Sequence, residues 1–166
     1  QLDVLTNAYA ASDVPVVHAG YANYRIPLLE AGVNLYELKP VADPTGGRLR
    51  DLGSGSSRAS LHAKAFVFDD EHVFIGSFNF DPRSALLNTE MGLVIASPTL
   101  AGRLAEVFDK DLPLFAYEVR LRADGGLEWI ERTAAGERRH QTEPGAGWFR
   151  RFTVDVLSAL PIDWML

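Results

Sequence analysis

The chain contains no cysteine, which excludes disulfide bonds and thiolate-ligated metal sites in its 166 residues and fits a reducing compartment. It also lacks any apolar run approaching the roughly eighteen residues of a membrane-spanning helix. Positive charge is not in surplus: the formal net charge is −6, so no global field favours nucleic acid as a partner. The remaining composition, 47% hydrophobic and 23% charged, is typical of one globular domain with a hydrophobic core.

The most informative stretch covers residues 61–92, LHAKAFVFDDEHVFIGSFNFDPRSALLNTEMG. Two apolar runs, 65–68 and 73–75, are separated by four polar, turn-forming residues, and this pattern predicts a β-hairpin. Because side chains alternate across a strand, His62 and Lys64 are expected on the same face. An imidazole and a cation on one face near a strand end suit a site that handles phosphate.

Further polar groups follow the same hairpin. Ser77 and Asn79 come directly after its second strand and could offer a hydroxyl and an amide to the same region. Glu90 could hold an imidazole N–H and fix its tautomer. Asp69, five residues after Lys64, is expected to anchor the hairpin rather than to carry a proton. Lysine, asparagine and imidazolium together can stabilise phosphoryl charge, so this set requires no metal.

The pattern H-x-K-x4-D, followed by G-S-x-N at 76–79 and by Glu90, resembles the phospholipase D superfamily. The flanking words GSFNFDPRS and LNTEMG resemble its bacterial cardiolipin synthase branch more narrowly. The resemblance implies an α/β fold, with a mixed β-sheet flanked by helices in a single phospholipase D-like domain over residues 1–166. Family members pair two such motifs, and this chain has one. We therefore expect the C-terminal half of a two-motif enzyme, with the second motif upstream of Gln1 or in a homodimer mate.

The same resemblance implies a phosphatidyl transfer between phospholipids through a phosphohistidine intermediate. The first motif's histidine is usually the nucleophile in this family, which would make His62 the general acid. The phosphate ligands it implies are Lys64, Ser77 and Asn79. The catalytic set it implies is His62, Lys64, Asp69 and Glu90. It implies no cofactor and no metal, a phospholipid substrate, and a peripheral position on the cytoplasmic face of the membrane.

Three other functions stay open at this point. Water in place of the acceptor alcohol would give a phospholipase D hydrolase. The smallest superfamily members build the paired site by homodimerisation, which would give a phosphodiesterase or nuclease, although the acidic balance disfavours nucleic acid. A domain whose partner half has lost its motif would serve as a membrane or protein adaptor.

The residues before the motif predict a β-α-β unit with parallel strands. Its strands are residues 2–6 and 33–38, and its helix is Val14–Ala31, with Pro27 expected to kink it or split it in two. His18 and Tyr21 on this helix either line a substrate channel or pack against the fold.

The segment 39–60 is rich in glycine, serine and proline, and it precedes His62 directly. It is expected either to cover the site as a lid or to be a disordered surface excursion. Its basic residues, which could meet lipid phosphates or remain solvated, are Arg48, Arg50 and Arg58.

Beyond the motif, residues 90–96 predict a buried strand, and Ser97-Pro98 predicts the start of a helix that ends near Leu112-Pro113. An antiparallel hairpin is expected over 116–122 and 127–132. The C-terminal region predicts a polar loop over 136–147 and an amphipathic helix over 148–160. That helix either lies on a membrane surface or docks on its own sheet.

Overall fold

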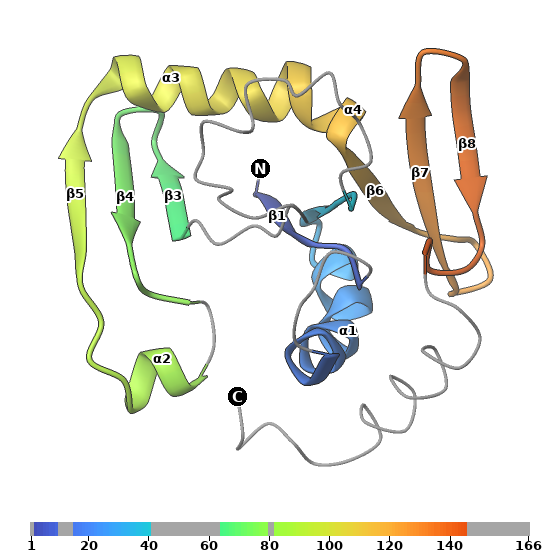
Figure 1. The fold of residues 1–166 in the computed structure, drawn as a ribbon, viewed down its shortest axis with the longest axis horizontal. Helices are drawn as coiled ribbons and strands as arrows, with labels where there is room; N and C mark the ends of the chain where they lie inside the picture. Colours follow the sequence, from blue (N-terminus) through green and yellow to red (C-terminus); the bar gives the residue numbers. More distant parts are fainter. Residues whose placement is uncertain (1, 10–14, 41–63, 80–81, 146–166) are drawn as a thin grey trace.

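The structure is a computed structural model that describes residues 2–9, 15–40, 64–79 and 82–145 (Figure 1). Several predictions fall outside these residues. They concern His62, nearly all of the segment 39–60 with its three arginines, and the helix over 148–160.

The N-terminal β-α-β unit is confirmed. Strands β1 (Asp3–Asn7) and β2 (Asn34–Leu38) pair in parallel, and helix α1 (Pro15–Glu30) connects them. Of the two expected effects of Pro27, a split is wrong, because the helix continues through it as one element, and a kink stays a prediction. Proline lacks an N–H donor, so α1 has one intrahelical bond fewer, but the chain stays helical to Glu30. Gly32, with a φ of 83°, then ends the helix in the left-handed conformation.

The larger sheet has five strands in the order β1-β2-β6-β7-β8. Strands β6 (Ala116–Leu121) and β7 (Leu127–Thr133) form the predicted hairpin. Strand β8 (Gly136–His140) pairs antiparallel with β7, so the predicted loop over 136–147 is wrong over its first five residues. The sequence GERRH has no apolar alternation because this strand is exposed along most of its length, and the usual strand signal is therefore missing.

The motif lies in a second, antiparallel sheet of three strands, so the described residues form two sheets rather than one. The predicted hairpin is confirmed as β3 (Lys64–Phe68) and β4 (His72–Gly76), and β5 (Gly92–Ala96) pairs with β4. The strand predicted over 90–96 is confirmed as β5, but its predicted burial is wrong: Leu93 is 68% and Val94 is 65% exposed. The reason is that β5 is an edge strand, while the neighbouring helix packs on β3 and β4.

That helix, α3 (Pro98–Glu106), begins as predicted at Ser97, whose side chain accepts a hydrogen bond from the backbone N–H three residues on. It does not end near Leu112-Pro113 but continues through a π-helical turn, Val107–Asp111, into α4 (Leu112–Phe115). Helix α3 packs on β3 and β4, whereas α4 packs on β6 and β7. The continuous helical segment therefore joins the two sheets, as Figure 1 shows along its upper side.

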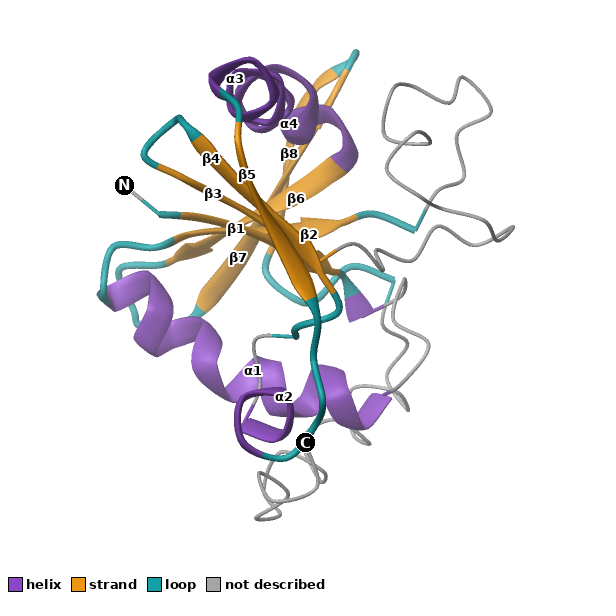
Figure 2. Cartoon of the chain, turned by 90° about the vertical axis from the view of Figure 1, so that its left-hand side faces the viewer, coloured by secondary structure: helices purple, strands orange, loops and turns teal. Residues whose placement is uncertain are grey.

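The main core lies between α1 and the larger sheet. Its buried members are Ala8, Val33, Leu35, Tyr117, Val119 and Trp129. Figure 2 shows the strands as a central layer, with α3 and α4 on one side and α1 on the other. Among the helices in the described ranges, none is long and apolar enough to cross a bilayer.

Candidate functional site

The predicted polar residues meet at one end of the three-stranded sheet. Lys64, the first residue of β3, is paired with Gly76 of β4, which is paired in turn with Gly92 of β5. Ser77 follows β4 directly, and Glu90 lies two residues before β5. The register of the strands therefore brings an ammonium, a hydroxyl and a carboxylate to the same end of the sheet.

Ser77 holds this end together through its backbone and its side chain. Its backbone N–H donates to the Met91 carbonyl at 2.8 Å, and the Met91 N–H donates to the Ser77 hydroxyl oxygen at 3.0 Å. The hydroxyl donates to Glu90 Oε2 at 2.5 Å. These bonds fix the Glu90 backbone and carboxylate against the end of β4. Serine is suited to this position because its hydroxyl can accept and donate at once.

The Glu90 carboxylate is stabilised in its ionised form. The hydrogen bond from Ser77 lowers its pKa most, and hydrogen bonds from Ser84 and Asn88 and the charge of Lys64 lower it further. Ser84 is buried on the short helix α2 (Pro82–Leu86), so α2 contributes to the same cluster. An anionic carboxylate beside a cation at a strand end can orient an imidazole and accept its proton.

The two glycines at this end leave room for the Phe74 ring, and Gly76 also lies close to the backbone of β5. A Cβ on Gly92 would lie far inside contact distance of the Phe74 ring, and a Cβ on Gly76 would lie 2.7 Å from Phe74 Cζ and 2.5 Å from the Met91 carbonyl oxygen. The Phe74 ring therefore folds over the paired glycines, in the space that side chains would otherwise fill.

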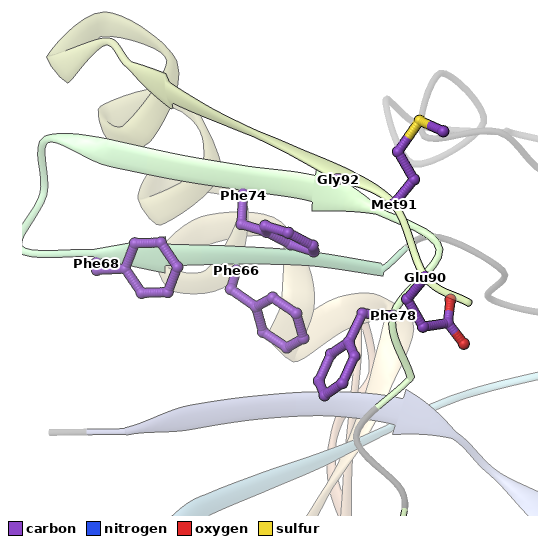
Figure 3. A pocket seen from close by; sticks show the side chains of 7 residues that line it. All are labelled: Phe66, Phe68, Phe74, Phe78, Glu90, Met91 and Gly92. Carbon is purple, nitrogen blue, oxygen red and sulfur yellow. The ribbon is translucent and has the colours of Figure 1, made fainter. Parts of the chain in front are cut away.

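An apolar groove begins at Glu90 and runs along the sheet (Figure 3). It is open, has a volume of about 410 Å³, and is lined almost entirely by apolar groups. The lining residues are Phe66, Phe68, Phe74, Phe78, Glu90, Met91 and Gly92. The four phenylalanines were not predicted as site residues; their alternation along the hairpin was the available signal.

The other predicted site residues are not all brought to this cluster. Asp69 lies in the turn at the opposite end of β3, five residues from Lys64, or roughly 16 Å along the strand. Its φ of 54°, shared by Asp70, is the conformation that tight hairpin turns require and aspartate tolerates. This position agrees with an anchoring role and not with contact with Lys64. Asn79 is exposed just beyond Ser77, and His62 lies outside the described residues.

His18 and Tyr21 take part in a buried polar network under α1 rather than in this cluster. His18 Nε2 lies 2.7 Å from Glu143 Oε1 and 2.9 Å from Arg25 Nη2. Arg25 Nε donates to the buried Glu37 carboxylate at 2.8 Å, and Arg25 Nη2 donates to Glu143 at 2.5 Å. The packing alternative therefore describes both residues.

Each charge in this network is compensated by others. Burial raises the pKa of Glu37, while Arg25 and a hydrogen bond from Trp129 Nε1 at 2.9 Å act in the opposite direction. Burial also raises the pKa of Glu143, but hydrogen bonds with His18 and Arg25 outweigh it and lower the pKa overall. The network fastens the segment after β8 to α1 and β2. The sequence did not reveal it, because its members are scattered along the chain.

In the parts of the chain that the structure describes, no three histidine, aspartate or glutamate side chains are grouped so that they could hold a metal ion. The charged groups at the end of the three-stranded sheet are Lys64 and Glu90. With the Ser77 hydroxyl, they offer a phosphoryl group one cation and one hydroxyl, and they offer an imidazole one carboxylate.

Comparison with known proteins gives the same family as the motif. The family described as "Cardiolipin synthase, PLD-like domain" matches residues 1–112. Cardiolipin synthase C of Escherichia coli K12 is 48% identical over 167 aligned residues, which cover 100% of this chain and 35% of that protein. The chain thus spans about a third of the length of this relative.

Two further relatives match shorter stretches. An uncharacterised protein of Helicobacter pylori 26695 is 38% identical over 104 residues, 63% of this chain and 20% of that protein. The major cardiolipin synthase ClsA of Bacillus subtilis 168 is 40% identical over 65 residues, 37% of this chain and 14% of that protein. No solved structure matches the chain significantly. Because the family match covers most of the chain and includes the entire three-stranded sheet, the chain belongs to the cardiolipin synthase family of phospholipase D-like domains.

Proposed function

We propose that this chain forms one half of the active site of a phosphatidyltransferase of the cardiolipin synthase type. The observation that carries the proposal is the meeting of Lys64, Ser77 and Glu90 at one end of a sheet whose first strand begins at Lys64, the lysine of the H-x-K motif. The name of the Escherichia coli relative, cardiolipin synthase C, supports the same reaction.

Written for phosphatidylglycerol as both donor and acceptor, the reaction has two half-reactions. First, a histidine nitrogen attacks the phosphorus, a P–N bond forms, and the P–O bond to glycerol breaks while the leaving oxygen takes a proton from an acid. Second, the hydroxyl of another phosphatidylglycerol gives its proton to the resulting base and attacks the phosphorus, and the P–N bond breaks. The products are glycerol and a lipid with two phosphatidyl groups on one glycerol.

Within this scheme His62 is the acid and base, and the nucleophile is the histidine of a second motif. Lys64 carries a fixed positive charge toward the phosphoryl oxygens, with Ser77 and Asn79 as further ligands. Glu90 holds an imidazole in position, and its depressed pKa keeps it ionised for that role. Asp69, at the other end of the hairpin, belongs to the turn that fixes the register of β3 and β4.

We propose that the second motif comes either from residues upstream of Gln1, in which case residues 1–166 are the C-terminal half of the catalytic unit, or from another copy of the chain. The substrate is a phospholipid, and the enzyme acts peripherally on the cytoplasmic face of the membrane. Strongly exposed apolar side chains near Glu90 support contact between this part of the protein and a membrane surface. They are Leu86 at 81%, Leu87 at 78% and Met91 at 81% exposure.

The test uses the full-length protein and phosphatidylglycerol vesicles, with lipid products separated by mass. The expected products are cardiolipin and free glycerol. Lys64→Ala is expected to lower the rate by about a hundredfold, the order for one lost electrostatic contact to a transition state. The matched control is Lys110→Ala, because Lys110 is 70% exposed and pairs only with Glu106 among the contacts described.

Other outcomes would identify the rival functions. Phosphatidic acid as the main product, even with added glycerol, would indicate a hydrolase. Cleavage of single-stranded DNA with no change in lipid would indicate a nuclease. Vesicle binding without turnover would indicate an adaptor. Each of these three results would refute the proposed transfer reaction.

A further inference from the structure

We propose that the aromatic groove beside Glu90 binds an acyl chain of the phospholipid whose phosphate lies at Lys64 and Ser77. The proposal rests on the proposed function and extends it, because it identifies the part of this domain that distinguishes a lipid phosphodiester from a water-soluble one.

The lining comes from one face of the hairpin and from the residues that follow it. Phe66 and Phe74 are cross-strand partners with ring centroids 5.5 Å apart. Alternation places both on the face opposite Val73, which is fully buried. Phe68 is on the same face as Phe66, and its side chain is exposed. This face of the sheet is therefore aromatic and partly open. The other face is aliphatic, and it is buried at Val73 but exposed at Val67 (37%) and Ile75 (47%).

The groove has one polar end and is aromatic along the rest of its length. Figure 3 shows Glu90 and Met91 at one end, Phe68 at the other, and the remaining rings between them. Glu90 is the single charged residue in the lining, and it is the residue that Ser77 holds at the candidate phosphate site. Lys64 is on the same face as Phe66 and two residues before it. The polar end of the groove is therefore continuous with the candidate catalytic cluster.

This order matches a phospholipid. In a diacylglycerol phosphodiester, the hydrocarbon begins a few bonds from the phosphorus, so a phosphate at Lys64 brings its acyl chains to the adjacent surface. The volume of about 410 Å³ falls within the range of small-molecule pockets, which are mostly apolar with a few polar groups that set orientation. A water-soluble phosphodiester has no hydrocarbon that could fill the groove.

The glycine pair under Phe74 gives the groove its floor. Because neither Gly76 nor Gly92 has a side chain, the Phe74 ring can lie flat over the backbone instead of projecting across the groove. Larger residues at these positions would push the ring outward into the space where the acyl chain is proposed to bind.

The test measures kcat/KM of the full-length protein on dibutyryl, dihexanoyl and dioctanoyl phosphatidylglycerol, each kept below its micelle concentration. For the unaltered protein we expect kcat/KM to rise by up to about fourfold for each methylene that the groove takes up. Phe68→Ala and Phe78→Leu should flatten this dependence, lowering kcat/KM about tenfold on the dioctanoyl lipid and by less than about threefold on the dibutyryl lipid. Phe78→Leu keeps the side chain apolar, so it remains informative if the alanine variant unfolds.

The matched control is Leu114→Ala, an exposed leucine on α4 that does not line the groove; it should leave the chain-length dependence unchanged. A direct measurement accompanies the kinetics. Phosphatidylglycerol with a diazirine at the end of one acyl chain should cross-link to Phe68, at the end of the groove away from Glu90, when the complex is irradiated.

The outcomes separate the two levels of the proposal. If the unaltered protein turns over no phosphatidylglycerol, the proposed function fails and the acyl site fails with it. If it turns over all three lipids and the Phe68 and Phe78 variants keep its chain-length dependence, the acyl site alone is refuted. Cross-links confined to residues outside the groove would also refute it.

Discussion

A single methyl group on Gly92 tests whether the Phe74 ring lies over the glycine pair. In Gly92→Ala the three nearest atoms to the new Cβ all belong to the Phe74 ring, and two of them lie far inside the roughly 3.5–4.0 Å of normal carbon–carbon contact. The ring must therefore leave its position. Overpacking of this kind typically costs about 1–3 kcal/mol, so we expect the free energy of unfolding to fall by that amount.

The sign of the effect should reverse when the ring is removed. The φ of Gly92 lies outside the left-handed region, so alanine fits the backbone there. In a Phe74→Ala background the added methyl has no ring to displace, and alanine is favoured over glycine in a strand by about 0.5–1 kcal/mol. The two substitutions should therefore be coupled by about 1.5–4 kcal/mol in a double-mutant cycle.

Urea unfolding of the four proteins, followed by circular dichroism, measures this coupling. Gly76→Ala is the matched control: its new Cβ would lie 2.5 Å from the Met91 carbonyl oxygen and 2.8 Å from Gly92 Cα, and both atoms are backbone. It should destabilise the protein with or without the Phe74 ring. Additive effects of Gly92→Ala and Phe74→Ala would show that the ring does not cover the glycines, and the described floor of the groove would be wrong.

Two further predictions concern the charged groups. Ser77→Ala removes the largest cause of the depressed Glu90 pKa, so that pKa should rise in a carbon-13 NMR titration, while Ser97→Ala, which caps α3, should leave it unchanged. The pKa of Glu90 is lower in the folded state than in the unfolded state, so ionised Glu90 stabilises the fold at any pH above its unfolded pKa. This contribution is lost as the pH falls through the depressed pKa. If the free energy of unfolding depended on pH identically in Ser77→Ala and in the unaltered protein, this explanation would be wrong. Arg25→Met leaves the fully buried Glu37 without its main cation and should lower stability at neutral pH by about 3–5 kcal/mol, whereas Arg139→Met, at an arginine that is 58% exposed, should cost less than about 1 kcal/mol. Equal losses in the two arginine variants would exclude a buried ion network.

The hairpin of the motif could be predicted because local signals decide it. Two apolar runs rich in aromatic and β-branched residues predict β3 and β4, and the aspartates between them tolerate the left-handed turn. A hairpin brings the start of its first strand near the end of its second, and the register shows that Lys64 and Ser77 share one end of the sheet. That Glu90 joins them depends on β5 pairing with β4, which no local pattern predicts; the resemblance to the family implied only the role of Glu90.

The parts that could not be predicted depend on distant contacts. Strand β8 forms because it pairs with β7. Its own residues are mostly charged and exposed, so no apolar pattern predicts it. Strand β5 has the composition of a buried strand, but its burial depends on what covers the edge of the sheet. The contact between Arg25 and Glu143 joins α1 to the segment after β8, and neither residue has a local signal for it.

The central claim is that phosphoryl transfer takes place at the Lys64 end of the three-stranded sheet, and its most direct test compares the histidine expected at that end of the hairpin with the histidine at the turn end. His62 belongs to the motif end with Lys64 by sequence, whereas His72 begins β4 at the turn end, paired with Phe68. In the full-length protein, release of glycerol from phosphatidylglycerol should fall by at least about a hundredfold in His62→Asn and by no more than about threefold in His72→Asn. Similar rates in the two variants would contradict a phosphoryl-transfer site at the Lys64 end of the sheet.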